Sequence, residues 1–311
     1  MPLRAAVQRA DAYRYQQFLI LMIIKGDMKL FRILLPVLLL CSWIITSCDK
    51  LDPPYAAVKT QYDTTNKPFV LLEEYTGHKC NNCPLATQKA HKLADYYAGR
   101  VIVMEVHATN LADPDPKYTL DLRTPEGAQW CTDFSIGYVP RALVNRTPVG
   151  GSYPVNSDQW AAAIELQMLK AVKTGISARS TYNNDTKEIT ADVTVRFRRK
   201  LSSSAGINLY ILEDSIVGLQ SNKDTAAGPT PEINPYYFNE TFRASMNGTY
   251  GEQLTASVDT TITYTYTKKF TVTNNDWDPT QLWLVTTITD PATSSGEIIG
   301  VKKVKISILG R

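Results

Sequence analysis

The apolar residues of this 311-residue chain change their spacing near Thr174, and this change limits the folds open to it. Before Thr174, short continuous apolar runs are followed by stretches in which apolar residues recur at helical spacing. After it, as in residues 189–197, apolar and polar residues alternate, which is the pattern of a strand buried on one face. The chain therefore predicts an α/β domain over residues 68–173 and an all-β sandwich over residues 174–311.

The first domain is expected to contain three strands and three helices in alternation. The strands are predicted over residues 69–75, 101–106 and 137–144, and the helices over residues 85–97, 124–134 and 157–173. Ser157 is a plausible N-cap of the last helix. The second domain is expected to contain seven or eight short strands and no helix.

The amino-terminal segment has the composition of a secretory signal. A basic stretch at residues 28–32 precedes the apolar run 33–45, which contains a proline and is too short to span a bilayer. The run leads into Thr46-Ser47-Cys48, which resembles a bacterial lipobox, where a small residue precedes the cysteine that receives a lipid. We expect residues 1–47 to be a signal peptide of lipoprotein type, with Cys48 as the lipidated first residue of the mature chain.

The start of the signal has two interpretations. Met28 is a more natural initiator than Met1, because a signal normally begins close to its first residue, and residues 1–27 then form an extension ahead of it. The alternative is an uncleaved anchor helix over residues 18–45. That helix would place charged side chains in the membrane, where they are costly: Lys25, Asp27, Lys29 and Arg32.

Removal of the signal changes the charge of the chain. The full sequence has 33 Lys and Arg against 30 Asp and Glu, a net charge of +3. Residues 1–47 hold six of the basic and two of the acidic side chains, which leaves 27 against 28 and a net charge of −1. This balance gives no reason to expect a nucleic-acid partner. The polar, unpatterned residues 48–67 are expected to be a lipidated tether.

Cys80 and Cys83 form a C-x-x-C motif between the first predicted strand and the first predicted helix. A cysteine at a helix start is stabilised as a thiolate by unpaired N–H groups and the helix dipole, so Cys80 is the expected nucleophile. Cys83, one turn on, can resolve a mixed disulfide. Export places both thiols in an oxidising compartment, where a disulfide between them can persist.

Two further residues make the motif more specific than an isolated pair. Glu74 ends the strand before the motif, where thioredoxins keep a buried acid that moves a proton to the resolving cysteine. Pro140 opens a later strand, where thioredoxins have a cis-proline that packs against the disulfide. The first domain therefore resembles the thioredoxin fold. The resemblance implies Cys80 as nucleophile, Cys83 as resolver, Glu74 as proton relay and Pro140 as the wall on the substrate side, with no cofactor.

The motif also departs from the thioredoxin pattern. Thioredoxins carry Trp before the first cysteine and Gly-Pro between the two, whereas here Lys79 precedes the motif and Asn81-Asn82 stand inside it. Two functions therefore stay open. The pair is the centre of an extracytoplasmic thiol–disulfide oxidoreductase, or it is a static Cys80–Cys83 disulfide that staples a helix start in a domain without catalysis.

A metal site is a less favoured alternative, and we expect no metal. His78 lies beside the two thiols of the motif, but a fourth ligand would have to come from His91, His107 or Cys131. Cys131, on the helix predicted over residues 124–134, is more simply a buried small apolar residue.

Aromatic residues of the second domain offer a function of another class. Residues 236–238 and the pair Tyr264 and Tyr266 could stack on a sugar or a peptide, as in a surface adhesin or glycan-binding lipoprotein. Aromatic residues in strands more often pack in the core or across strands. The binding function is therefore kept as an alternative.

Several segments of the mature chain resemble the bacteroidete outer membrane protein 28-related lipoproteins. Besides the lipobox, they are residues 73–84 with the C-x-x-C motif, 123–125, 139–140, 144–146 and 238–244. The resemblance covers both domains and implies an outer-membrane lipoprotein, held through the lipid on Cys48 and facing the periplasm or the cell surface, but it implies no particular reaction. We thus expect a thioredoxin-like domain followed by an immunoglobulin-like sandwich, with protein thiol clients or an extracellular ligand as partners.

Overall fold

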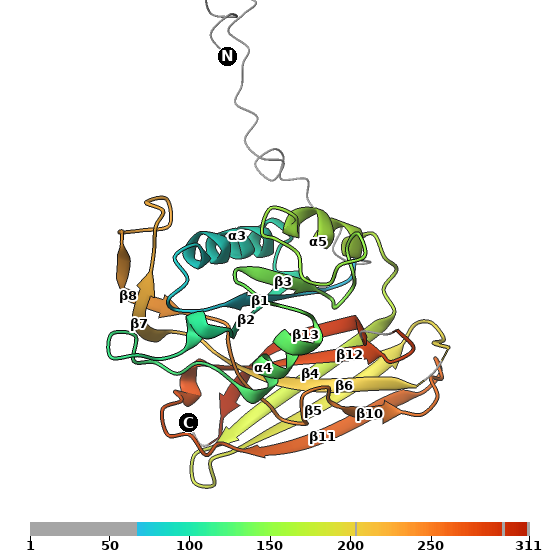
Figure 1. Cartoon of the computed structure of the whole chain (residues 1–311). Helices are drawn as coiled ribbons and strands as arrows, with labels where there is room; N and C mark the ends of the chain where they lie inside the picture. The colour runs from blue at the N-terminus through green and yellow to red at the C-terminus, as the bar shows by residue number, and fades with distance from the viewer. Residues whose placement is uncertain (1–66, 203, 294–295, 310–311) are drawn as a thin grey trace, which may run out of the picture. The chain divides into compact units, whose positions relative to one another are not determined.

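A computed structural model of the chain describes residues 67–311, except residues 203, 294–295 and 310–311 (Figure 1). The predicted signal peptide, Cys48 and all of the tether up to residue 66 lie outside the described residues. The described part is mostly β, with one large mixed sheet and few helices. No helix in this part is long and apolar enough to cross a membrane.

The predicted first domain contains a small three-stranded arrangement with helices on it. Its elements are β1 (Val70–Thr76), α3 (Cys83–Tyr96), β2 (Val101–His107), η1 (Asn110–Ala112), α4 (Pro125–Asp133), β3 (Arg141–Val144) and α5 (Trp160–Met168). Strand β1 lies between β2, its parallel neighbour, and β3, its antiparallel neighbour. Helices α3 and α5 pack on the same face of these strands, where Leu72, Ala90 and Trp160 belong to one buried cluster (Figure 1).

Two local predictions for this domain are wrong. Helix α5 is shorter than predicted and begins at Trp160, because residues 156–159 form a turn before it. Its N-cap is therefore Gln159 and not Ser157. Strand β3 begins at Arg141, so Pro140 lies immediately before the strand rather than within it.

The predicted second domain contains ten strands among its described residues rather than seven or eight. They are β4 (Thr174–Asn183), β5 (Glu188–Phe197), β6 (Ala205–Glu213), β7 (Ile216–Ser221), β8 (Glu232–Phe238), β9 (Thr241–Ser245), β10 (Glu252–Thr255), β11 (Thr263–Thr271), β12 (Leu282–Asp290) and β13 (Glu297–Ile308), with the short helix η2 (Pro279–Gln281) before β12. The strand expected from the sequence over residues 236–244 is divided into β8 and β9, because Glu240 takes a left-handed backbone conformation between them.

One continuous sheet joins the two predicted domains. Its strand order is β11-β5-β4-β13-β12-β6-β9-β2-β1-β3, and β10 also pairs with β6. The link is β9, which pairs with β6 on one side and with β2 on the other. β6 and β12 contribute to two apolar cores, one shared with β5 and the other with α4, β1 and β2. Their apolar runs are therefore nearly continuous instead of alternating.

A two-stranded hairpin stands apart from this sheet. β7 and β8 pair only with each other in the described sheets, and they lie beside the amino-terminal end of α3 (Figure 1). Gln88 of α3 donates a 3.1 Å hydrogen bond to the carbonyl oxygen of Ala227 in the hairpin loop. A segment of the predicted second domain thus reaches the C-x-x-C region of the first.

Candidate functional site

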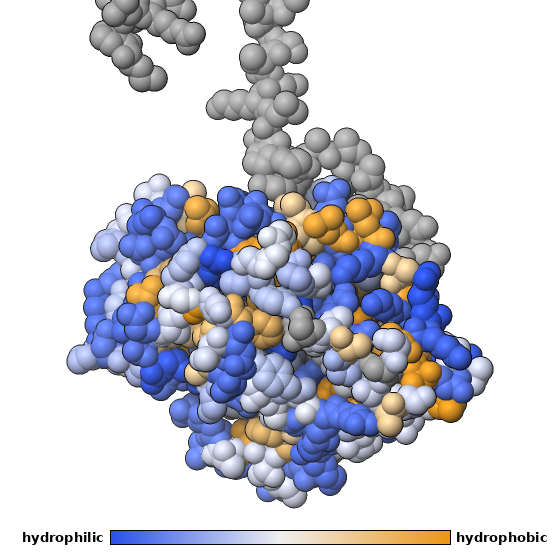
Figure 2. All heavy atoms as spheres, turned by 45° about the vertical axis from the view of Figure 1, so that its right-hand side comes forward, coloured by the Kyte–Doolittle hydropathy of each residue, from blue (hydrophilic) through white to orange (hydrophobic). Residues whose placement is uncertain are grey.

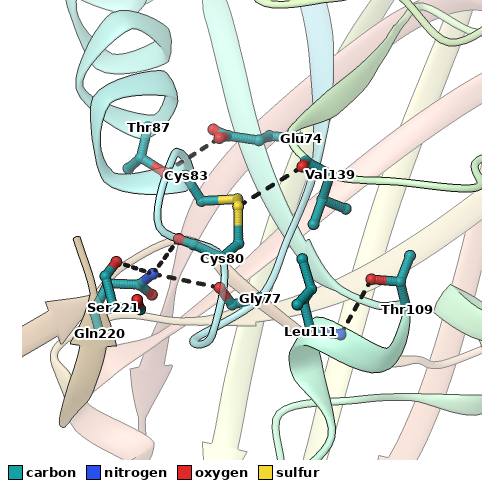
Figure 3. The surroundings of a disulfide bond; sticks show 10 residues. All are labelled: Glu74, Gly77, Cys80, Cys83, Thr87, Thr109, Leu111, Val139, Gln220 and Ser221. Atoms are coloured by element: carbon teal, nitrogen blue, oxygen red, sulfur yellow. Dashed lines mark hydrogen bonds between the residues drawn. A yellow bond between two sulfur atoms is a disulfide. The ribbon is translucent and has the colours of Figure 1, made fainter. Parts of the chain in front are cut away.

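The two cysteines of the motif form a disulfide at the start of α3 (Figure 3). Cys83 is the first residue of α3, and Cys80 lies one turn before it. The side chains are buried, with 2% and 1% exposure. The backbone N–H of Cys80 donates to the carbonyl of Gly77, and that of Cys83 to the carbonyl of Cys80, which fixes the turn that joins the sulfurs.

The loop before β3 lies against the disulfide. Sγ of Cys80 is 3.8 Å from the carbonyl oxygen of Val139, and the Val139–Pro140 peptide bond is cis. A pocket of about 480 Å³ opens beside this contact and is lined by Val139, Pro140, Leu85 and Tyr138 among others. Leu85 and Tyr138 are among the few large apolar side chains that stay exposed. The sequence-predicted residues Cys80, Cys83 and Pro140 thus share one site.

Glu74 is completely buried on the face of β1 that meets α3. Its Oε1 atom accepts a 3.2 Å hydrogen bond from Oγ1 of Thr87, one helical turn after Cys83 (Figure 3). Its Oε2 atom has no hydrogen-bond partner among the described residues. Burial raises the pKa of Glu74 to about 8, because the Thr87 hydrogen bond opposes only part of this effect and the charge of Glu240 adds to it. The carboxyl therefore holds its proton at neutral pH.

A second buried acid, Glu105, lies beside Glu74 and was not predicted. The two are register partners on the parallel strands β1 and β2, and Glu105 is 2% exposed. Burial, and then the neighbouring Glu74, raise the pKa of Glu105 well above its ordinary value. The sequence carried a signal for it, since a single acid stands at this position in an otherwise apolar strand.

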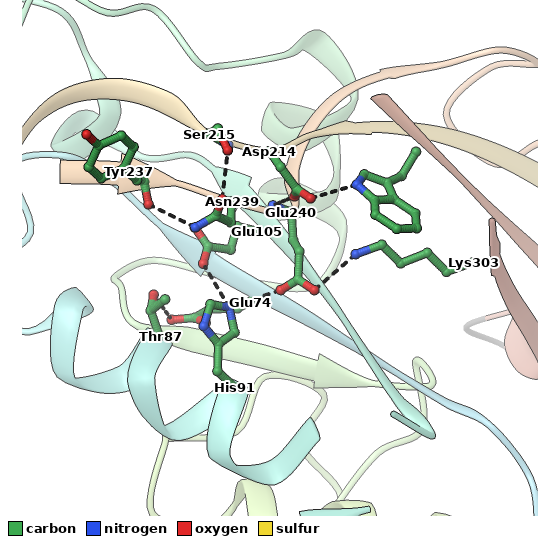
Figure 4. A network of polar contacts seen from close by, with 11 residues as sticks. Glu74, Thr87, His91, Glu105, Asp214, Ser215, Tyr237, Asn239, Glu240 and Lys303 are labelled. Atoms are coloured by element: carbon green, nitrogen blue, oxygen red, sulfur yellow. Dashed lines mark hydrogen bonds and ion pairs between the residues drawn. The ribbon is translucent and has the colours of Figure 1, made fainter. Parts of the chain in front are cut away.

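Glu240 carries the negative charge of this cluster (Figure 4). Its carboxylate accepts from Nε2 of His91 at 3.0 Å and from Nζ of Lys303 at 3.0 Å. Burial favours the neutral form, but His91 and Lys303 outweigh it and lower the pKa of Glu240. His91 is also 4.0 Å from Oε1 of Glu105. A charged carboxylate thus faces two buried carboxyls that retain protons.

The β7–β8 hairpin covers the other side of the motif. Nε2 of Gln220 donates to the carbonyl oxygen of Cys80 at 2.9 Å (Figure 3). The backbone N–H of Ser221 donates to the carbonyl of His78 at 2.8 Å. The backbone N–H of Lys223 donates to the carbonyl of Asn81 at 3.1 Å. These contacts explain the burial of the disulfide, and sequence reasoning missed them because no local pattern connects positions so far apart.

The candidates for a metal site are separated by their own packing. The ring of His78 stacks on Tyr118, while His107 is buried and packs edge-on against Phe238. Burial lowers the pKa of His107 to about 3. Cys131 is a half-buried free thiol, and burial raises its pKa to about 11. Among the described residues, no group of three or more His, Cys, Asp or Glu side chains is arranged to hold a metal ion.

The aromatic residues proposed as a binding platform lie on separate sheets. Tyr236 and Tyr237 are on β8 of the hairpin, whereas Tyr264 and Tyr266 are on β11 at the edge of the large sheet. Tyr264 and Tyr266 pack against the core, so they serve as partly buried strand residues. On the face drawn in Figure 2, apolar side chains lie in separate small groups among hydrophilic ones.

The family model of outer membrane protein Omp28 matches residues 128–308, which is more than half of the chain. The chain belongs to this family. The outer-membrane location expected from the sequence is therefore confirmed. No curated protein matches the chain.

HBP35, a protein of known structure, resembles this Omp28 family member in fold. HBP35 of Porphyromonas gingivalis has a TM-score of 0.61 at 16% identity, over 79% of this chain and 78% of that one. A protein of Agrobacterium tumefaciens has a TM-score of 0.47 at 13% identity, over 76% and 94%. A domain of the outer membrane lipoprotein Omp28 from Porphyromonas gingivalis has a TM-score of 0.29 at 18% identity, over 44% and 90%. At 16% identity the likeness to HBP35 concerns the fold and not the reaction.

Proposed function

We propose that this Omp28 family protein is a lipoprotein anchored through Cys48 whose Cys80–Cys83 disulfide exchanges with thiols of client proteins. Its residues 68–173 act as a thioredoxin-like domain, and residues 174–311 act as an immunoglobulin-like interaction module. The observation that carries the proposal is the carboxyl of Glu74, which is completely buried beside α3 and accepts a hydrogen bond from Thr87, one helical turn beyond Cys83. Burial of an acid without an ion partner is unfavourable, and a disulfide that only staples the helix start does not require it.

Each residue has a defined part in the exchange. Cys80 lies before the helix start and is attacked by, or attacks, the client sulfur. Cys83 is the leaving and resolving sulfur, and Glu74 supplies its proton. The exposed pocket beside Pro140 provides the surface for the client segment, with Leu85 and Tyr138 as apolar contacts.

One observation favours a second function, in which the disulfide only staples the start of α3. The sulfurs are almost fully buried, and Gln220, Ser221 and Lys223 of the hairpin segment hold the motif by three hydrogen bonds. In that case the protein would act through binding alone. Reactivity of the disulfide distinguishes the two functions.

The test is the reduction potential of Cys80–Cys83 together with capture of clients by a Cys83→Ser variant. We expect a potential more oxidising than about −300 mV and a set of mixed disulfides with envelope proteins. A lower potential without any trapped protein would establish the static staple instead.

Matched variants make the capture experiment specific. It is carried out with Cys131→Ser, so that the third thiol cannot contribute. A Cys80→Ser variant retains Cys83 as the single motif thiol and is expected to trap few or no clients. Equal capture by both variants would contradict the assignment of Cys80 as the nucleophile.

A further inference from the structure

We propose that Glu240 is a positioning residue that keeps Glu74 protonated and thereby makes it the proton donor to Cys83. This inference rests on the proposed exchange function and adds to it a residue from the opposite end of the chain. Without Glu240, the protonation of Glu74 would depend mainly on residues of its own predicted domain. Instead, the segment between β8 and β9 brings a fixed negative charge to it.

The backbone conformation and two backbone hydrogen bonds fix the position of Glu240. Its φ angle is 53°, a left-handed conformation that non-glycine residues seldom adopt and that clusters at functional sites. Its backbone N–H donates to Oδ1 of Asp214 at 2.7 Å, and its carbonyl oxygen accepts from the N–H of Glu105 at 2.9 Å (Figure 4). Strand β2, which carries the buried Glu105, therefore also holds the charged Glu240 in place.

Whether Glu74 keeps its proton depends on the polar and charged groups of every element that surrounds it. The groups that face the cluster are Thr87 and His91 from α3, Glu105 from β2, Tyr236 from β8, Glu240 itself and Lys303 from β13. The cations His91 and Lys303 contact Glu240 directly, and neither is bonded to Glu74. The buried acids consequently face a carboxylate, and among the described residues Oε2 of Glu74 accepts no hydrogen bond that would stabilise its charged form, while Oε1 of Glu105 lies 4.0 Å from Nε2 of His91.

The chemical step uses one proton of this cluster. A client thiolate attacks Sγ of Cys80, the Cys80–Cys83 bond breaks, and its electron pair leaves on Sγ of Cys83. The proton of Glu74 passes to that sulfur. A second client thiolate then attacks the client sulfur of the mixed disulfide, which oxidises the client by two electrons and releases Cys80 as a thiolate. Solvent takes up the client protons and returns one to Glu74.

The experiment measures reduction of the disulfide by dithiothreitol between about pH 6 and 10, with each rate divided by the thiolate concentration. In the wild type we expect a constant value at low pH that falls with a midpoint near pH 8, where Glu74 loses its proton. Glu240→Gln removes the nearby negative charge, so the midpoint moves down by at least about 0.5 pH unit. Glu240→Asp retains the charge, so its midpoint should stay close to that of the wild type.

A second variant should shift the midpoint the other way. His91→Gln removes an imidazole whose protonated form Glu240 stabilises, while Lys303 still holds Glu240 charged, so the midpoint moves up. Damage to the fold would not produce opposite shifts, and Glu165→Gln on the exposed face of α5 is the control without a shift. Unchanged midpoints in both variants would overturn this inference alone. Absence of exchange in the wild type at every pH would overturn the proposed function.

Discussion

The two faces of β1 give two neighbouring glutamates opposite electrostatic surroundings. Glu73 and Glu74 are both 0% exposed, and they point to opposite sides because successive strand residues alternate. Glu73 meets the guanidinium of Arg146, with Nη2 2.7 Å and Nε 3.0 Å from its Oε1 atom. Glu74 accepts a hydrogen bond from the hydroxyl of Thr87, and its register partner on the next strand is another acid, Glu105.

The difference teaches that burial by itself does not decide the charge of an acid. A bidentate guanidinium compensates Glu73, and the aromatic rings of Trp130 and Phe134 lie under that guanidinium. No such partner exists for Glu74 among the described residues, so the neutral form prevails there. One face of β1 therefore holds a structural ion pair, and the other holds a buried carboxyl that keeps its proton.

The largest effect is expected from breaking the ion pair. Arg146→Ala leaves the carboxylate of Glu73 buried and uncompensated, which should lower the free energy of unfolding by about 3–5 kcal/mol. Urea denaturation monitored by circular dichroism measures this loss. The double variant Glu73→Leu/Arg146→Met should recover most of it, because no charge then remains buried. A loss below about 1 kcal/mol in Arg146→Ala would remove the contrast between the two faces.

An effect of intermediate size on the free energy of unfolding is expected from Glu74, on the other face of β1, and this effect depends on pH. The pKa of Glu74 is raised in the folded protein, so the native state binds more protons than the unfolded state between pH 4.5 and about 8. Stability should therefore fall as pH rises through this window, by a few kcal/mol in total.

Glu74→Gln removes this contribution, so its stability should decline less with pH than that of the wild type. The comparison is made by urea denaturation at both ends of the window. At the acidic end the two proteins should be similar, because Glu74 is protonated in either state. A parallel decline in both proteins would show that Glu74 is ionised in the native state.

The smallest effect is expected where the same kind of ion pair is exposed. Arg179 and Asp192 join neighbouring strands at 3.0 Å, but Arg179 is 82% exposed. Water screens this pair, so Arg179→Ala should change the free energy of unfolding by less than about 1 kcal/mol. Thermal or urea denaturation checks this value. A loss as large as that of Arg146→Ala would mean that pairing rather than burial governs both sites.

Much of the local structure could be predicted from the sequence. The strand ending near Glu74, the helix after the motif and the later strand after Pro140 are all present. The alternating residues 189–197 form β5 as expected. The predictions fail where long-range packing overrides the local pattern, as in the hairpin that leaves the sheet and in β6, which is buried on both faces.

The candidate site was predicted only in part for the same reason. Cys80, Cys83 and Pro140 belong to short motifs, and the structure joins them. The sequence offered His91 only as a possible metal ligand, yet it contacts Glu240, 149 positions away. Gln220 is a strand residue without any motif, and it donates to the carbonyl of Cys80.

By itself the sequence determined the α/β and β regions, the C-x-x-C motif with its acid, and the family and outer-membrane location, because each depends on residues close together in the chain. The tertiary structure alone decided that one sheet joins the two regions and that Glu240 and the hairpin complete the site. It also decided which of two adjacent buried glutamates is charged. That outcome depends on a guanidinium or a carboxyl brought from distant positions, and solvation and Coulomb interactions act through space rather than along the sequence.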